Sequence, residues 1–305
     1  MKIGAFIFAT DYAIRTDELA RELEHRGFDS LFLPEHTHIP VSRVSSYPGG
    51  GELRKEYWHT YDSFVALAYA AAATRTLKIA TGITLLPQHD TFNAAKAVAS
   101  LDRMSEGRML FGIGGGWNVE EMGNHGVAYG TRFKVLRERV LAMKELWTSE
   151  EASFEGDFIK FDPVWAWPKP KQSPHPPILL GGNTDHTIRR VVDFCDGWIP
   201  ANWPGFDAVE GMNRLRRIAD EAGRDVSDFS VTLVRGEPDR AKLDAYEKAG
   251  LTRVLLTLPS ADRDTVLRQL DDYAFPVVAR KLMATGRASW RQASFLGHTL
   301  DRGES

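Results

Sequence analysis

Two neighbouring residues that can exchange a proton stand out first in this sequence. Glu35 and His36 follow the short apolar run and proline of LFLP. An imidazole gives or takes a proton near neutral pH, and a carboxylate beside it can accept a hydrogen bond from a ligand. The pair could also be a structural hydrogen-bond partner of the loop that follows. The residue types alone leave both roles open, and we treat the two as candidate catalytic residues.

The first of two glycine-rich turns spans residues 112–118, with the sequence GIGGGWN after another apolar run. Glycines there let the backbone approach a ligand that side chains would exclude. The spacing differs from the Gly-x-Gly-x-x-Gly of dinucleotide-binding proteins, because Trp117 occupies the place of the third glycine counted from Gly112. The turn therefore favours a ligand-binding loop over a Rossmann fingerprint, with a flexible strand-to-helix turn as the alternative.

The second glycine-rich turn holds Gly181, Gly182, Asn183 and Thr184, between an apolar run and a predicted helix. A strand that breaks into small residues before a helix exposes backbone N–H groups at the positive end of the helix dipole, which suits a phosphate group. Asn183 or Thr184 could also cap the helix, and capping is compatible with phosphate binding. The pattern predicts a phosphate-binding turn.

Other chemistries find little support in the sequence. His36 and His38 stand two residues apart on an irregular segment, His89 lies beside an aspartate, and no helical zinc-ligand spacing occurs. The motifs of acyl transfer and nucleotide hydrolysis do not occur either. The single cysteine, Cys195, cannot form an internal disulfide and is expected to be a small core residue at a helix end. We expect no catalytic metal.

The composition indicates a folded protein that acts on a small molecule. Apolar residues make up 43% of the chain and charged residues 26%, close to the average for folded domains. The formal net charge of -3 offers no positive field for nucleic acid or an anionic membrane. The apolar start is about one strand long, and no later stretch approaches the roughly 18 uncharged residues of a spanning helix. We expect a cytoplasmic protein with a small-molecule substrate.

The elements that position these residues alternate along the chain, each short apolar run being followed by an amphipathic segment. This alternation is typical of parallel strands joined by crossover helices. The predicted strands lie at 2–8, 30–33, 77–85, 109–112, 177–180, 197–200, 229–234 and 253–258. The predicted helices lie at 16–26, 61–74, 92–104, 132–147, 185–194, 206–222, 240–249 and 262–273. Eight such units predict an α/β fold of the (β/α)₈ TIM-barrel class, with a doubly wound open sheet as the alternative.

Two insertions interrupt the alternation. Residues 38–58 are polar and rich in Pro, Gly and Ser, and residues 149–176 carry several aromatics and prolines. Both are predicted to form walls or lids of a substrate cavity at the carboxyl ends of the strands. Four tryptophans are expected near that cavity, which are Trp58, Trp165, Trp167 and Trp203. They indicate an apolar substrate or, equally, pack the insertions onto the barrel.

A single barrel domain is predicted over residues 1–280. Residues 281–305 are predicted to form a C-terminal tail, in which Trp290 and Phe295 stand among polar residues. The tail is either a partly ordered appendage or a contact between subunits, and the sequence leaves both interpretations open.

Four stretches of the chain resemble a known family. They are LFLPEHTHIP, ATGITLLPQHDTFNAAKAVASLDRMSEGRMLFGIGGGWNVEEM, PKPKQSPHPPILLGGNTDHTIRRVVDFCDGWI and RVLLTLPSADRDTVLRQLDDYA. Over about residues 1–275 the chain resembles the luciferase-like monooxygenase superfamily, and more closely its branch of coenzyme F420-dependent oxidoreductases. The second stretch is the most specific, because it joins a strand, a helix and a glycine turn in one order.

The resemblance implies a role for each candidate residue. A non-proline cis peptide bond at Gly82–Ile83 is expected to press on the central ring of the cofactor. Glu35 and His36 match the acidic residue and histidine that end the second strand in relatives using the deazaflavin, and His36 would act at the hydride-transfer centre. The implied cofactor contacts are Gly82, Ile83, Gly114, Gly115, Gly116 and Glu120 for the ring and its side chain, and Gly181, Gly182, Asn183 and Thr184 for the phosphate. Trp117 replaces the catalytic glutamate of some sugar-phosphate dehydrogenases of this superfamily, so their substrate is not implied.

The implied activity is hydride transfer between coenzyme F420 and a small organic substrate. The alternative enzyme is a monooxygenase that uses FMN, receives the reduced flavin from a separate reductase and activates O2. A third interpretation, from a different class, is a protein that binds a flavin or deazaflavin without turnover. The resemblance also implies a homodimer.

Overall fold

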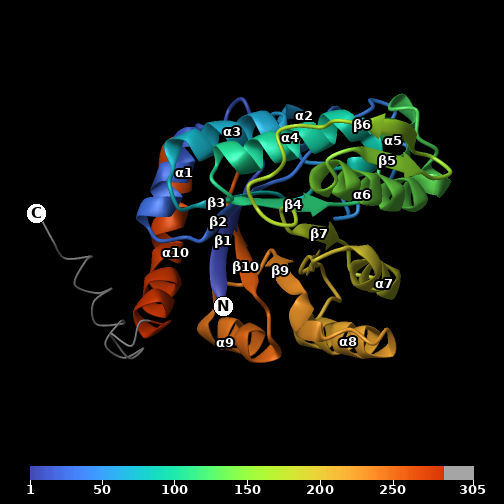
Figure 1. Cartoon of the computed structure of the whole chain (residues 1–305). Helices are drawn as coiled ribbons and strands as arrows, with labels where there is room; N and C mark the ends of the chain where they lie inside the picture. The colour runs from blue at the N-terminus through green and yellow to red at the C-terminus, as the bar shows by residue number, and fades with distance from the viewer. Residues whose placement is uncertain (285–305) are drawn as a thin grey trace, which may run out of the picture.

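A computed structural model describes residues 1–284 of the chain, with side chains to residue 273, and these residues contain a closed barrel of parallel strands (Figure 1). The order around the ring is β1, β10, β9, β8, β7, β4, β3 and β2. The strands are β1 (Lys2–Phe6), β2 (Ser30–Leu33), β3 (Lys78–Thr81), β4 (Met109–Ile113), β7 (Ile178–Gly181), β8 (Gly197–Ile199), β9 (Ser230–Val234) and β10 (Arg253–Thr257). Because β1 pairs with both β2 and β10, the ring has no free edge. The predicted TIM barrel is confirmed, and the open-sheet alternative is wrong.

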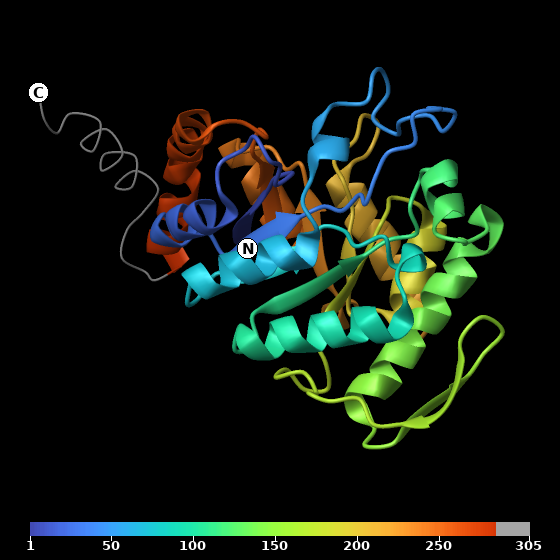
Figure 2. The same ribbon diagram turned by 90° about the horizontal axis from the view of Figure 1, so that it is seen from above.

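One long helix follows each barrel strand and covers its outer side (Figures 1 and 2). These helices are α1 (Thr16–His25), α3 (Ser63–Ala73), α4 (Thr91–Met104), α6 (Arg132–Thr148), α7 (Asp185–Phe194), α8 (Ala208–Glu221), α9 (Arg240–Ala249) and α10 (Arg263–Ala284). Aspartate side chains fix several of the helix starts: Asp62, Asp90 and Asp207 each accept a hydrogen bond from a backbone N–H of the first turn. The bounds agree with the predicted ones to within a few residues, except that α10 continues well beyond the predicted residue 273.

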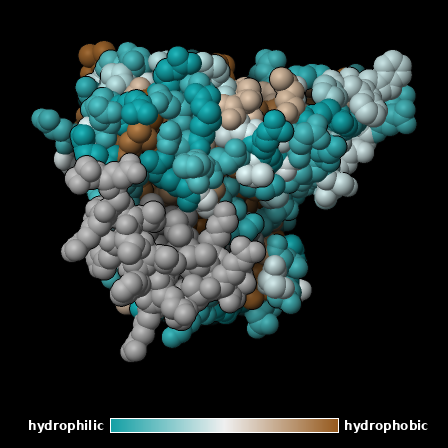
Figure 3. Space-filling model, turned by 90° about the vertical axis from the view of Figure 1, so that its left-hand side faces the viewer, coloured by the Kyte–Doolittle hydropathy of each residue, from teal (hydrophilic) through white to brown (hydrophobic). Residues whose placement is uncertain are grey.

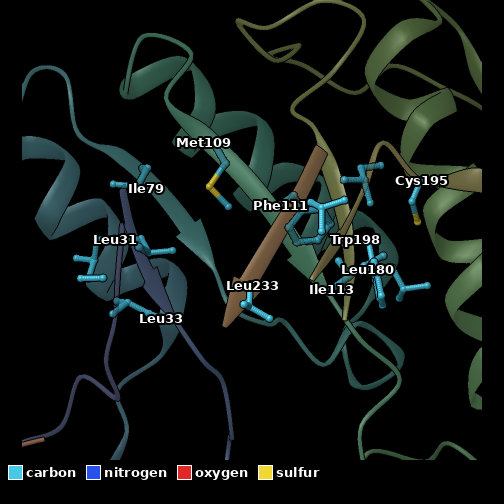
Figure 4. Close-up of a cluster of buried hydrophobic side chains, with 14 of the residues drawn as sticks. Leu31, Leu33, Ile79, Met109, Phe111, Ile113, Leu180, Cys195, Trp198 and Leu233 are labelled. Carbon is cyan, nitrogen blue, oxygen red and sulfur yellow. The ribbon is translucent and has the colours of Figure 1, made fainter. Parts of the chain in front are cut away.

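Side chains of the barrel strands alternate between an outer and an inner core. In β2, Leu31 and Leu33 pack in the outer core against the helices, whereas Phe32 packs inside the barrel. The outer core is drawn in Figure 4, and it includes Cys195, which is buried directly after α7 as predicted. The inner core consists of Phe32, Ala80, Leu110, Leu179, Ile199, Val234 and Leu255. Two apolar layers thus hold the strand ends in fixed positions.

The insertion at residues 38–58 rises over the carboxyl ends of the strands, as predicted. It leads into the short helix α2 (Glu56–His59). Tyr47, Pro48, Arg54 and Tyr57 line the main cavity of the described chain. The prediction that this insertion walls the cavity is confirmed.

The same prediction for residues 149–176 is wrong. They form an antiparallel hairpin of β5 (Ala152–Glu155) and β6 (Lys160–Val164), which packs against α6 at the edge of the molecule, and a following loop that contacts α4 (Figure 2). The Lys169 ammonium donates to carbonyls at the end of α6, and Asp102 near the end of α4 accepts from the loop backbone. The segment joins the end of a helix to the start of a strand, which places it at the amino ends of the barrel strands.

The solvent-facing surface in the view of Figure 3 is mainly hydrophilic. Among the residues that the structure describes, no helix combines the length and the hydropathy needed to span a membrane. Of the predicted tail, residues 281–284 belong to α10. The rest of it, with Trp290 and Phe295, lies outside the described residues.

Candidate active site

A cavity of about 1000 Å³ opens at the carboxyl ends of the barrel strands. This is the end at which barrel enzymes carry their active sites. The predicted site residues that line the cavity are Glu35, His36, Gly82, Ile83, Gly115, Gly116, Gly181, Gly182, Asn183 and Thr184. Residues from distant parts of the sequence, predicted as one site, therefore meet in one place.

Ile83 forms part of the cavity floor, and two glycines make room for its side chain. The Gly82–Ile83 peptide bond is cis, as the resemblance implied. A Cβ atom on Gly114 would lie 2.0 Å from Ile83 Cδ1, and one on Gly181 would lie 3.2 Å from it. Gly114 thus stands behind Ile83 and is not itself among the cavity-lining residues. The apolar floor and the bare backbone around it suit the face of a flat ring system.

His36 lies at the carboxyl end of β2 with both ring nitrogens in contact with other side chains. Its Nδ1 is 2.8 Å from Glu121 Oε2 and 3.1 Å from Glu121 Oε1. Its Nε2 accepts a hydrogen bond of 3.3 Å from the indole N–H of Trp117. The His36 side chain is only 5% exposed, yet His36 lines the cavity. A buried imidazole that lines a cavity, with a carboxylate on one nitrogen and a longer indole contact on the other, can act as a general base or acid.

Glu35 lines the cavity, but both of its carboxylate oxygens already have partners within the protein. One oxygen accepts from the backbone N–H of Leu85 at 2.7 Å, and the other contacts His89 Nε2 at 2.8 Å. Burial opposes a charge on His89, but the hydrogen bond and charge of Glu35 outweigh it and hold the pKa of His89 above 6.5. Glu35 therefore fixes the segment that follows β3. It is a positioning residue.

The turn after β7 has the geometry expected of a phosphate site. Thr184 caps α7 by accepting a hydrogen bond from the backbone N–H of Thr187, and the first N–H groups of α7 have no partner within the helix. The Asn183 side chain is engaged with the backbone of Ala201 in both directions, and the Asn183 backbone carbonyl accepts a hydrogen bond from Arg214, so the backbone N–H is the group left for a ligand. Gly182 has a φ of 133°, which requires glycine.

Two arginines that sequence reasoning missed stand beside this turn. Arg132 at the start of α6 and Arg190 in α7 both line the cavity, and their guanidinium carbons lie 4.5 and 4.0 Å from the ring centroid of Phe133. Burial and the nearby charge of Arg132 lower the pKa of Arg190. Arg132 Nε is buried without a hydrogen-bond partner. Neither arginine forms an ion pair with a carboxylate in the described part of the chain, so the pair offers unneutralised positive charge to an anion.

Glu120, which the resemblance placed at the cofactor, contacts the insertion at residues 38–58 instead. Its carboxylate accepts hydrogen bonds from the backbone N–H groups of Val44 and Ser45 and from the Ser45 hydroxyl. The Ser45 hydroxyl above all, with these N–H groups, holds the pKa of Glu120 at about 2. Glu120 is not among the cavity-lining residues. Glu120 anchors the cavity wall, and its expected contact with a cofactor stays a prediction.

Aromatic side chains surround His36 on the open side of the cavity. The Tyr57 ring lies 5.3 Å and the Trp117 ring 5.8 Å from the His36 ring. Phe6, Phe8, Tyr47 and Trp203 also line this space. Of the four tryptophans expected there, Trp58, Trp165 and Trp167 are exposed and do not line the cavity. Within residues 1–273, no cluster of His, Cys, Asp or Glu side chains has the arrangement of a metal site.

Comparison with known proteins identifies one family by sequence and several solved structures that share the fold of this chain. The model of the family "Luciferase-like monooxygenase" matches residues 2–237. The uncharacterized protein Rv0953c of Mycobacterium tuberculosis (strain ATCC 25618 / H37Rv) is 40% identical over 269 residues, which cover 87% of this chain and 94% of that protein.

Two solved structures share the fold at low identity. One is an F420-dependent secondary alcohol dehydrogenase in complex with an F420-acetone adduct, with a TM-score of 0.66, 18% identity and coverage of 90% of this chain and 98% of the other. The second is riboflavin lyase RcaE with modified FMN and riboflavin, with a TM-score of 0.72, 14% identity and coverage of 95% and 92%. From the match of its sequence over residues 2–237 we conclude that this chain belongs to the luciferase-like monooxygenase family.

Proposed function

We propose that this protein is an oxidoreductase that transfers a hydride between coenzyme F420 and a small, weakly polar organic substrate. The observation that carries the proposal is the common cavity, in which a proton-exchanging His36, an apolar floor at Ile83 and an anion site at Arg190 meet. The known dehydrogenase complex with F420 and acetone has the same fold and supports the choice of cofactor.

The residues present fit a flat cofactor with an anionic end. Ile83 and the glycines around it leave space for a ring, and Arg132 Nε needs an acceptor that the described protein does not supply. The phosphate would lie at the start of α7, between the backbone of Gly182 and the two guanidinium groups of Arg132 and Arg190. The deazaflavin, when bound, would supply the hydride acceptor or donor.

The chain's own residues supply position and proton transfer. In the oxidative direction, His36 Nε2 would take the proton of the substrate hydroxyl while the carbon loses its hydride; in the reductive direction it would return that proton to the carbonyl oxygen. The aromatic rings of Tyr57, Trp117 and Phe8 would hold an apolar substrate against the cofactor and exclude water.

An FMN-dependent monooxygenase is the second candidate, favoured by the structural neighbour that holds modified FMN. F420 and FMN share the tricyclic ring and ribityl phosphate, so Ile83 and the arginines suit both. Parallel titrations of the purified protein with F420 and FMN separate the two. We expect tighter binding of F420, and F420-dependent turnover on a panel of alcohols, carbonyl compounds, enones and imines.

Tighter binding of FMN, with consumption of O2 when reduced flavin is supplied, would replace the proposal by the monooxygenase. Tight F420 binding without turnover on the whole panel would favour a binding protein. The variant His36→Asn separates cofactor binding from catalysis, because it should keep the cofactor affinity of the unmodified protein and lose turnover.

A further inference from the structure

We propose that Glu121 is a positioning residue that keeps the proton of neutral His36 on Nδ1 and leaves Nε2 as the base for the substrate oxygen. The inference deepens the proposed function and rests on it. Sequence reasoning did not single out Glu121, which is 85 residues away from its partner. No motif in the sequence links the two residues.

The contact between Glu121 and His36 is fully buried. The Glu121 side chain is 0% exposed, and both of its oxygens lie within hydrogen-bond distance of His36 Nδ1. Its backbone N–H donates to the side chain of Asn118, which caps α5 (Val119–Asn124) and fixes the orientation of the first turn. The carboxylate therefore reaches His36 from a rigid support.

The hydrogen-bond donors and acceptors around His36 determine which ring nitrogen carries the proton. An ionised carboxylate only accepts hydrogen bonds, and a buried one without a donor is costly. Among the described residues, His36 Nδ1 is the hydrogen-bond donor found for the Glu121 carboxylate. Nδ1 must therefore carry the proton. On a neutral ring, Nε2 then keeps its lone pair.

Trp117 gives independent support from the other side of the ring. An indole N–H is a donor only, and it points at His36 Nε2 over 3.3 Å. Nε2 is therefore an acceptor, which is the same tautomer that Glu121 requires. The distance is at the long end for such a bond, so a substrate hydroxyl that enters the cavity can replace the indole as donor to Nε2.

In catalysis, His36 would exchange the proton with the substrate, and Glu121 would hold and stabilise the His36 ring. In the proposed oxidation of an alcohol to a carbonyl compound, Nε2 would take the proton of the hydroxyl, and a bound deazaflavin would supply the hydride acceptor. The ring then carries a positive charge, which the buried Glu121 carboxylate stabilises at 2.8 Å. In reverse, the same ring returns the proton to the oxygen. Glu121 is not among the cavity-lining residues, so it would act through His36.

Two variants at Glu121 separate its charge from its hydrogen bond. Glu121→Gln keeps an oxygen acceptor for the Nδ1 proton and removes the charge, whereas Glu121→Leu removes both. Glu138→Gln is the matched control, because the Glu138 carboxylate accepts only from backbone N–H groups of the β5–β6 turn, away from the cavity.

The first readout needs neither cofactor nor activity. Nitrogen NMR of protein labelled with ¹⁵N-histidine reports the tautomer of each ring, and His36 is assigned by the signal that is lost in His36→Asn. We expect the Nδ1–H tautomer in the unmodified protein and in Glu121→Gln, and a smaller share of it in Glu121→Leu, where the long Trp117 contact alone still favours it. Unchanged His36 signals in Glu121→Leu, or an Nε2–H tautomer in the unmodified protein, would overturn the inference.

The second readout is the separation of kcat from binding. Turnover should fall about 10-fold to 100-fold in Glu121→Gln and about 10²–10⁴-fold in Glu121→Leu, with cofactor Kd and substrate KM within about threefold of the unmodified protein. Equal loss in KM and Kd would indicate a merely structural role and overturn the inference. If no cofactor gives turnover while the nitrogen signals behave as expected, the proposed function is wrong and the assignment of the tautomer to Glu121 is supported.

Discussion

Replacing Gly114 with alanine tests whether Ile83 is the surface on which the cofactor ring rests. The new methyl group would lie 2.0 Å from Ile83 Cδ1, whereas carbon atoms in contact prefer about 3.5–4.0 Å. The Ile83 side chain must therefore move by about 1.5–2 Å. Because Ile83 lines the cavity, open space for the displaced side chain lies on the cavity side.

The expected cost appears in cofactor binding more than in folding. The displaced atom is the end of a side chain beside an open cavity, so the fold can adjust. The cofactor must then bind over a raised floor, and overpacking of this kind costs about 1–3 kcal/mol, which corresponds to about a 10-fold to 100-fold weaker Kd.

The assay is an equilibrium titration with F420 followed by its fluorescence, with thermal unfolding measured on the same samples. The matched control is Gly123→Ala in α5, where nothing lies within 4 Å of the new methyl group and alanine favours the helix. The control should bind F420 like the unmodified protein. Unchanged F420 affinity in Gly114→Ala, at unchanged stability, would refute the placement of the ring on Ile83.

Four further outcomes follow from the same geometry. His36→Ala should lower turnover by about 10²–10⁴-fold and leave the cofactor Kd nearly unchanged, and steady-state kinetics with a parallel titration would show this. Arg190→Gln should weaken F420 binding by about 10-fold and reduce its dependence on salt concentration, measured by titrations at several ionic strengths; an identical salt dependence would remove Arg190 from the anion site. The pKa of His89 is raised, so the stability that its contact with Glu35 provides is full below about pH 6.5 and is lost as pH rises through the raised pKa. The difference in Tm between the unmodified protein and Glu35→Gln should therefore shrink from pH 6 to pH 9. A difference in Tm that stays constant over this range would contradict the assignment. Burial opposes the charge of Glu24, yet hydrogen bonds from Thr76 and neighbouring N–H groups hold its pKa at about 2, so Glu24→Gln should cost about 1–2 kcal/mol above pH 5 after allowance for solvent screening and progressively less toward pH 2, as measured by denaturant unfolding.

The barrel could be predicted from the sequence because its signals are local. Runs such as residues 30–33 are apolar throughout, since one side faces the inner core and the other faces the helices. The glycine turns also follow from local needs, as at Gly182, where φ excludes other residues. The strands and the glycine turns can therefore be predicted without knowledge of any contact between distant residues.

The parts that were missed depend on contacts between distant residues. Glu120 and Glu121 are adjacent and chemically alike, but the rotation of α5 turns one toward Ser45 and the other toward His36. In the sequence, Arg190 has the pattern of a surface arginine on an amphipathic helix. Only the fold shows that it lies beside the turn after β7. Residues 149–176 were misplaced because their composition was given more weight than the order of the elements: a connection from a predicted helix to the next predicted strand lies at the amino ends of a barrel.

The most direct test of the account is a crystal structure of the protein with F420 bound. The account predicts the central ring against Ile83, the phosphate within hydrogen-bond distance of Arg132 or Arg190 at the start of α7, and His36 Nε2 facing the free side of the ring. F420 bound outside this cavity, or bound with its phosphate away from both arginines, would contradict it.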